Sequence, residues 1–190
     1  MTALFRSTQD ALIFAFRFSG QSYDRPAVNR MAASTVGSGN GLAGLDGAAQ
    51  AGMVRAEVAA LGRLFEAVLV ARFAPRSSPC QCGAACCARE RANSEWVNAV
   101  AYLADEMRTT ALAGCLTTGL LRRDYVVRYF TAKDARESVG AIADRYGVDR
   151  RTAGAHAGKV ARFLGDSPDG AEEHAMAAID ERLREYGVVP

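Results

Sequence analysis

Apolar residues recur at the spacing of an α-helix along almost the whole chain. The clearest case runs from Ala48 to Phe73, where apolar side chains three and four residues apart line one face: Val54, Val58, Leu61, Phe65 and Val68. Further apolar residues widen this surface, so we expect a helix that is buried on two sides or pairs with another chain in a homodimer. No alternating pattern of useful length indicates a β-strand. The sequence therefore predicts an all-α fold.

Capping residues and helix breakers mark the other helices. We expect a first helix from Ser7 to near Gly20, a second from Asp24, and others over 93–107, 120–130 and in the C-terminal tail. The segment 34–47 has five glycines and no regular period, so it is predicted to be a loop.

We divide the chain into three parts on this basis. A helical body covers residues 1–132 and contains the glycine-rich loop 34–47 and a cysteine-rich loop 76–92. A helix-turn-helix follows over 133–164, and an acidic helix over 165–190 ends the chain.

The composition is that of a globular protein, with 49% hydrophobic and 23% charged residues. No run of about 18 apolar residues predicts a membrane span. The apolar run Ala11–Phe16 is short and flanked by charges, which argues against a signal peptide. We therefore expect a cytoplasmic protein whose thiols stay reduced.

Charge is distributed unevenly along the chain. Residues 121–163 carry ten Lys and Arg against five Asp and Glu, whereas residues 164–190 carry two against seven. A basic block of this kind is typical of a surface that binds a polyanion. Double-stranded DNA is therefore the predicted partner.

The segment 139–159, VGAIADRYGVDRRTAGAHAGK, has the residues of a helix-turn-helix at their required places. Ala143 is small where two helices cross, and Gly147 can adopt the positive φ of a sharp turn. Val148 fills the angle between the helices, and Asp149 caps the second one. That helix exposes Arg150, Arg151, Thr152, Ala155, His156, Lys159 and Arg162.

These side chains suit the major groove of DNA. We expect four of them to face bases, namely Arg150, Arg151, Thr152 and His156. Phosphates would be held by Arg145, Lys159 and Arg162. The alternative is a helical hairpin with a solvated basic face.

Residues 137–164 resemble the helix-turn-helix of phage and prophage transcription regulators, including the type similar to sigma region 4. The layout of the whole chain resembles the late-gene antitermination proteins of lambdoid phages, the Q family. The resemblance implies a small, mostly helical protein that binds DNA beside a promoter in the bacterial host and acts on RNA polymerase and its sigma factor. The lambda-type zinc motif has two separated CxxC pairs, and CQCGAACC departs from it.

Four of the five cysteines lie within eight positions: Cys80, Cys82, Cys86 and Cys87. Structural zinc takes four tetrahedral ligands, among which thiolate is preferred. We therefore predict a structural Zn²⁺ site in this loop, bridging the two long helices on either side. Reduced or redox-active thiols and disulfides are the alternatives.

Adjacent cysteines have diverging side chains, so three of the four with one outside ligand would bind an ion with less strain. The other His and Cys residues are His156, His174 and Cys115. Of these, Cys115 lies in an apolar segment and is expected in the core.

No residues pair a nucleophile with a base at a recognisable spacing. The segment GSGNGLAGLDG lacks the GK[ST] ending of a phosphate-binding loop. We predict that the protein is not an enzyme. Besides a transcription regulator, the pattern permits a DNA-packaging adaptor similar to a small terminase subunit, or a metal- or redox-responsive DNA-binding protein.

Overall fold

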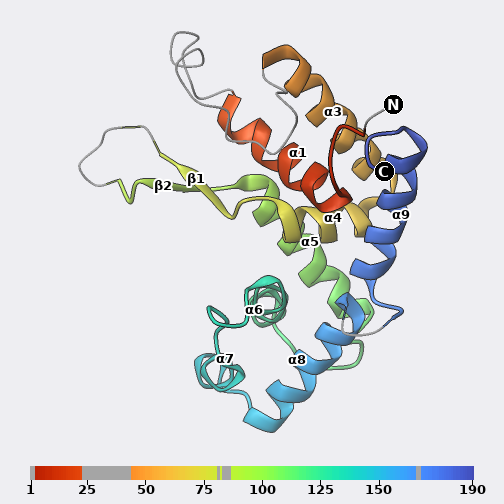
Figure 1. The fold of residues 1–190 in the computed structure, drawn as a ribbon. Coiled ribbons are helices and arrows are strands. Elements are labelled where there is room, and N and C mark those ends of the chain that lie inside the picture. Colours follow the sequence, from red (N-terminus) through yellow and green to blue (C-terminus); the bar gives the residue numbers. More distant parts are fainter. Residues whose placement is uncertain (1–2, 23–43, 81, 83–86, 166–167) are drawn as a thin grey trace.

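The computed structural model describes residues 3–22, 44–80, 82, 87–165 and 168–190 (Figure 1). Within these residues it has eight helices: α1 (Thr8–Ser22), α3 (Gly44–Ala60), α4 (Arg63–Phe73), α5 (Ser94–Thr109), α6 (Gly119–Phe130), α7 (Val139–Tyr146), α8 (Arg150–Leu164) and α9 (Ala171–Glu185). Two short strands, β1 (Ser77–Pro79) and β2 (Glu90–Ala92), pair between α4 and α5. The fold is mostly helical as predicted, and the hairpin is an element that the sequence pattern did not predict.

Helix α4 lies at the centre of the helical body. Its five consecutive residues from Ala67 to Ala71 are all buried, so this part of the helix has no face toward solvent. The helix packs against α5, α9, α3 and α1. The apolar surface that was predicted to be buried on two sides is therefore covered by other helices of the same chain.

The predicted helix over 48–73 is divided into two. Helix α3 ends at Ala60 and α4 begins at Arg63, with Gly62 between them at a φ of 91°. This backbone conformation is strained for residues with a side chain, so the glycine permits the chain to change direction here. The hydrophobic period continues across the break, which is why the pattern alone predicts one helix.

Helix α3 also begins earlier than expected. Residues 44–47 were predicted to belong to the glycine-rich loop but form its first turn. The rest of that loop, and the helix expected from Asp24, lie outside the described residues.

Helix α5 follows the sequence prediction closely. Asn93 is the N-cap, and its side chain accepts a hydrogen bond from the backbone N–H of Glu95. The predicted apolar face is buried, and the Trp96 indole donates to the carbonyl of Ala71 at 3.1 Å. This tryptophan joins α5 to α4 and belongs to the core.

The C-terminal helix α9 packs on the helical body. Glu172 in its first turn accepts two hydrogen bonds from Arg72 of α4, at 2.5 and 2.6 Å, and one from the Tyr129 hydroxyl of α6 at 2.7 Å. Further along, Arg182 donates to Glu57 of α3 at 3.0 Å. Charges of the acidic tail thus hold it to the body.

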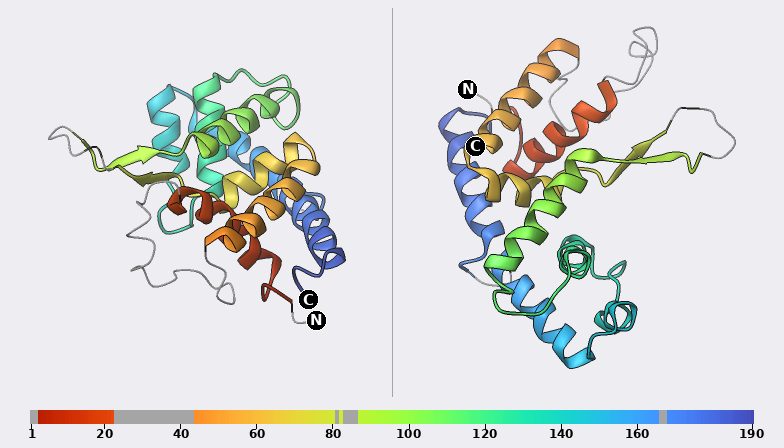
Figure 2. Two further views of the ribbon diagram at one scale, coloured as in Figure 1. Left: turned by 90° about the horizontal axis from the view of Figure 1, so that it is seen from above. Right: turned by 180° about the vertical axis from the view of Figure 1, so that it is seen from behind.

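Helices α6, α7 and α8 form a group of three below the body in Figure 1. There α6 and α7 are seen nearly end-on, and α8 runs across the view. All three pairs of helices are in contact, and α5 covers α6 from above. The two views of Figure 2 show the same group beside the helical body.

Gly147→Ala should destabilise the fold because Gly147 has a φ of 63°, which costs a residue with a Cβ about 1 kcal/mol. Gly154→Ala is the matched control, since Gly154 lies inside α8 with open space around it and alanine has the higher helix propensity by about 1 kcal/mol. Urea unfolding should show changes of opposite sign. Changes of the same sign would contradict this account of the turn.

Candidate functional site

The described cysteines Cys80, Cys82 and Cys87 lie between β1 and β2, at the outer end, or tip, of a β-hairpin that projects from the helical body in every view (Figures 1 and 2). The strands are antiparallel, with Ser77 opposite Ala92 and Pro79 opposite Glu90. The backbone N–H of Cys80 donates to the carbonyl of Arg89 at 2.8 Å and extends the pairing by one step. Strands of three residues are too short for an alternating pattern to reveal them.

This position corrects the predicted role of a metal in bridging the flanking helices. The base of the hairpin joins the two helices through Asn93. Its side chain donates to the carbonyl of Pro75 at 2.8 Å, and its backbone N–H donates to the carbonyl of Arg76 at 2.9 Å. An ion held by Cys80, Cys82 and Cys87 would lie beyond the paired strands and not between the two helices.

Three of the four predicted ligands come together at this tip. The Sγ atoms of Cys80, Cys82 and Cys87 all lie within 4.8 Å of one another, so they could bind a metal ion. The backbone N–H of Arg89 donates to the Cys87 Sγ at 3.3 Å, which favours a thiolate there. Cys86, the fourth predicted ligand, lies outside the described residues.

Contacts among the thiols raise the pKa of Cys87. The main cause is a hydrogen bond with Cys82, and a further one with Cys80 acts in the same direction, while the N–H of Arg89 lowers the pKa. Since the thiolate is the form that binds a metal, metal binding by these cysteines would release protons and would be favoured by rising pH.

The structure does not bring the suggested outside ligands to this cluster. His156 lies in α8, His174 in α9, and Cys115 between α5 and α6. Cys115 is half-buried rather than in the core, and its Sγ lies 3.5 Å from the Lys159 Nζ. None of the three belongs to the group of close cysteine sulfurs.

Helices α7 and α8 are joined by a tight turn that has the expected chemistry. Gly147 adopts the left-handed conformation, and the N–H groups of Gly147 and Val148 both donate to the carbonyl of Ala143. Asp149 then caps α8 by accepting from the Thr152 N–H at 2.9 Å, and this bond lowers the pKa of Asp149. Ala143 is fully buried.

Helix α8 has two distinct faces. One face is buried and consists of Ala153, His156, Val160 and Leu164. The other is exposed and carries Arg151, Thr152, Ala155, Lys159 and Arg162. The sequence of α8 has no acidic residue, so all charged side chains on its exposed face are positive.

Burial corrects the prediction that His156 faces bases. Its side chain is only 7% exposed, and its ring makes an edge contact with Tyr125 of α6, at 6.1 Å between ring centres. The face of α8 that was taken to reach solvent is narrower than the sequence suggested. Ala153, one turn earlier, is fully buried on the same face of α8.

Two of the predicted DNA-binding arginines are paired with acids. Arg145 donates to Asp124 at 2.6 Å and also to Glu137, and Arg150 donates to Asp144 at 3.0 Å. These contacts hold α7 to α6 and to the start of α8. We therefore remove the buried His156 from the candidate DNA-binding residues, whereas Arg145 and Arg150 stay exposed but already have acidic partners.

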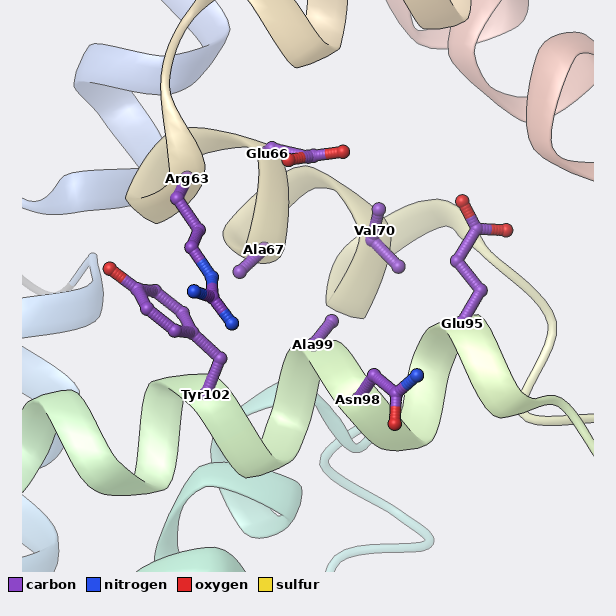
Figure 3. A pocket seen from close by; sticks show the side chains of 8 residues that line it. All are labelled: Arg63, Glu66, Ala67, Val70, Glu95, Asn98, Ala99 and Tyr102. Atoms are coloured by element: carbon purple, nitrogen blue, oxygen red, sulfur yellow. The ribbon is translucent and has the colours of Figure 1, made fainter.

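A shallow groove of about 200 Å³ lies between α4 and α5 (Figure 3). Arg63 reaches across it to the ring of Tyr102, 4.6 Å from its centre, and Glu95 pairs with Arg55. The polar groups at both ends of the groove thus have partners within the fold. It is not our candidate site.

No protein-family model, curated protein or solved structure matches this chain. None of the helices in the described residues has both the length and the apolar character that crossing a membrane requires.

The free energy of unfolding should decrease as the pH is lowered, because of His156. Burial, and secondarily the charge of Lys159, lowers the pKa of His156 below its usual 6.5. The unfolded chain therefore takes up a proton first, and the free energy of unfolding falls as pH drops below about 6.5, by at most about 1.4 kcal/mol per pH unit.

His156→Leu should remove this part of the pH dependence in urea unfolding between pH 7.5 and 5. The exposed His174 is the control, and His174→Gln should retain the dependence. An unchanged pH profile in His156→Leu would contradict the assigned cause.

Proposed function

We propose that the protein is a sequence-specific DNA-binding regulator that places α8 in the major groove. The observation that carries this proposal is the exposed face of α8. Arg151, Lys159 and Arg162 make no ion pair with any acid among the described residues, although the chain pairs many of its other arginines. Cations without a paired acid along one helix face suit a polyanion.

The arrangement of the three helices supports the same proposal. A helix-turn-helix needs a first helix that supports the other two, a short turn and a second helix with one free side. Here α6 contacts both α7 and α8, and the turn at Gly147 is tight. The buried face of α8 is used by this packing, which leaves the basic face for a ligand.

The residues of α8 then divide into two roles. Arg151 and Thr152 in the first turn, with Ala155 one turn later, would lie nearest the bases. The Thr152 hydroxyl also donates to Asp149 at 3.2 Å, so it is the more restrained of the two polar groups. Lys159 and Arg162 are farther along the helix and would meet phosphates.

Arg151→Ala should weaken binding to the preferred site far more than binding to random DNA, because a base-contacting arginine provides roughly 1–3 kcal/mol of discrimination. Lys159→Ala should weaken both alike and reduce the slope of the salt dependence by about one counterion. The measurement is fluorescence anisotropy over a salt series, with a duplex selected from a random library and its scrambled form.

The control for these variants is Arg6→Ala, which removes an exposed cation of the helical body, just before α1 and outside the three-helix group. It should leave affinity unchanged. If Arg6→Ala weakened binding as much as Lys159→Ala, net charge rather than the α8 face would explain the affinity.

We further propose that the cysteine cluster binds structural Zn²⁺. Cys80, Cys82 and Cys87 supply three thiolates, and the sequence offers Cys86 as a fourth. Four thiolates would leave no open position for catalysis, so the ion would order the hairpin tip.

Elemental analysis should find about one zinc per chain, and Cys87→Ser should lose most of it. Cys115→Ser is the control and should keep the metal, because Cys115 lies away from the hairpin. The free energy of unfolding of the helical body should change little in Cys87→Ser, since the tip projects from it. Zinc-free protein whose cysteines all titrate freely would contradict this proposal.

The more specific version of the function is transcription control in a phage or prophage, with RNA polymerase as a second partner. It is supported by the resemblance of residues 137–164 and by the separate, projecting hairpin, which offers a contact surface away from α8. Footprinting on phage promoter DNA with and without RNA polymerase tests it. Large ring-shaped assemblies without any effect on transcription would favour a packaging adaptor instead.

A further inference from the structure

A cavity of about 170 Å³ lies where the base of the hairpin meets the end of α6 and the loop that follows it. Its charged lining residues are Arg76, Arg128, Asp124 and Glu137. It belongs neither to the exposed face of α8 nor to the cysteine cluster. Its charged lining residues must therefore be explained separately.

Arg128 is the residue of this cavity that the fold does not explain. Its Nε atom is buried and has no hydrogen-bond partner, and its guanidinium forms no ion pair within the described part of the chain. Burying a charged donor without a partner is unfavourable. The pKa of Arg128 is lowered, first by this burial and second by the nearby charge of Arg136.

The neighbouring arginines have partners of another kind. Arg76 donates to the carbonyl of Phe130 at 3.1 Å and to the Thr131 hydroxyl at 2.8 Å, and Arg136 donates to the carbonyls of Tyr129 and Thr131. They satisfy the last carbonyls of α6. Neither cation is paired with an acid, and burial lowers the pKa of Arg76 as well.

The two carboxylates of the cavity are already engaged elsewhere. Asp124 accepts from Arg145 at 2.6 Å and from the Tyr146 hydroxyl at 2.9 Å, and Glu137 accepts from Arg145. No ion pair joins either acid to Arg76 or Arg128 among the contacts of the described residues. Two arginines of the lining, Arg76 and Arg128, therefore have no paired acid, and the charge of Arg136 lies near Arg128.

We propose that this cavity binds a phosphate-type oxyanion, with Arg128 and Arg76 as its charged donors. A tetrahedral oxyanion would accept from the Arg128 Nε–H and from the free N–H groups of Arg76, and its charge would offset the mutual repulsion of the arginines. The volume admits a single phosphate group with a small substituent. The phosphate has two sources, a free phosphorylated ligand or the backbone of bound DNA.

Inorganic phosphate is the probe for the site itself, and the assay contains no DNA, so its result is independent of the proposed function. Isothermal titration of the full chain with sodium phosphate, against sodium chloride of equal ionic strength, should show saturable binding. Arg128→Gln should weaken it about tenfold or more. Arg123→Gln, on the same helix but outside the cavity lining, should leave it unchanged.

Two results would overturn the proposal: no saturable phosphate binding by the native chain, or equal losses in Arg128→Gln and Arg123→Gln. Should Arg128→Gln fail to fold by circular dichroism, Arg76→Gln takes its place with the same expectation.

A second arm of the experiment distinguishes the two sources of phosphate. If Arg128→Gln also weakens binding to duplex DNA and lowers its salt slope by about one counterion, the site holds a DNA phosphate. If DNA affinity is unchanged while phosphate binding is lost, the site belongs to a free phosphorylated ligand.

Discussion

The burial of residues 67–71 of α4 on all sides is the constraint on which the rest of the fold depends. A stretch of helix with no solvent face needs neighbours on every side, and α1, α3, α5 and α9 supply them. Burial of so much apolar surface is the main stabilising contribution available to a helical domain of this size. The two ends of α4 determine where the neighbouring elements lie. The chain turns at Gly62 before the N-terminal end of α4, and it enters the β-hairpin after the C-terminal end.

Arg72, near the C-terminal end of α4, connects this core to the three-helix group. It pairs with Glu172 of α9 and lies over the rings of Tyr129 and Phe130 of α6, at 5.3 and 5.0 Å from their centres. The Tyr129 hydroxyl donates to the same carboxylate. One half-buried polar cluster thus joins three helices, so α8 is held in a defined position relative to the body through α6.

Local features were predictable from the sequence, and features set by distant contacts were not. Some features depend only on residues a few positions apart, and these can be recognised in the sequence. They are the cap at Asn93, the turn at Gly147 and the buried face of α5. The hairpin is too short to have a pattern, and the break at Gly62 interrupts no hydrophobic period. His156 is buried because α6 packs against α8, which no spacing within α8 reveals.

The charge pattern shows the same limit. The sequence correctly marks 121–163 as a basic block, but cannot say which cations the fold uses itself. Arg122 is buried and donates to the carbonyls of Ala104 and Thr117, and Arg145 holds two acids. The candidate cations without a paired acid, Arg151, Lys159 and Arg162, all lie on one face of α8.

The two glycines of α8 have a consequence for how closely another molecule can approach this helix. A Cβ at Gly154 or Gly158 would meet nothing within 4 Å, so packing does not require either residue to be glycine. Each weakens the helix by about 1 kcal/mol relative to alanine. Because neither glycine has a side chain, a molecule on this side of the helix between Arg151 and Lys159 could contact main-chain atoms at Gly154 and Gly158. Alanines at both positions would make α8 more stable but also wider there, and any molecule that bound this face would lie farther from the helix axis.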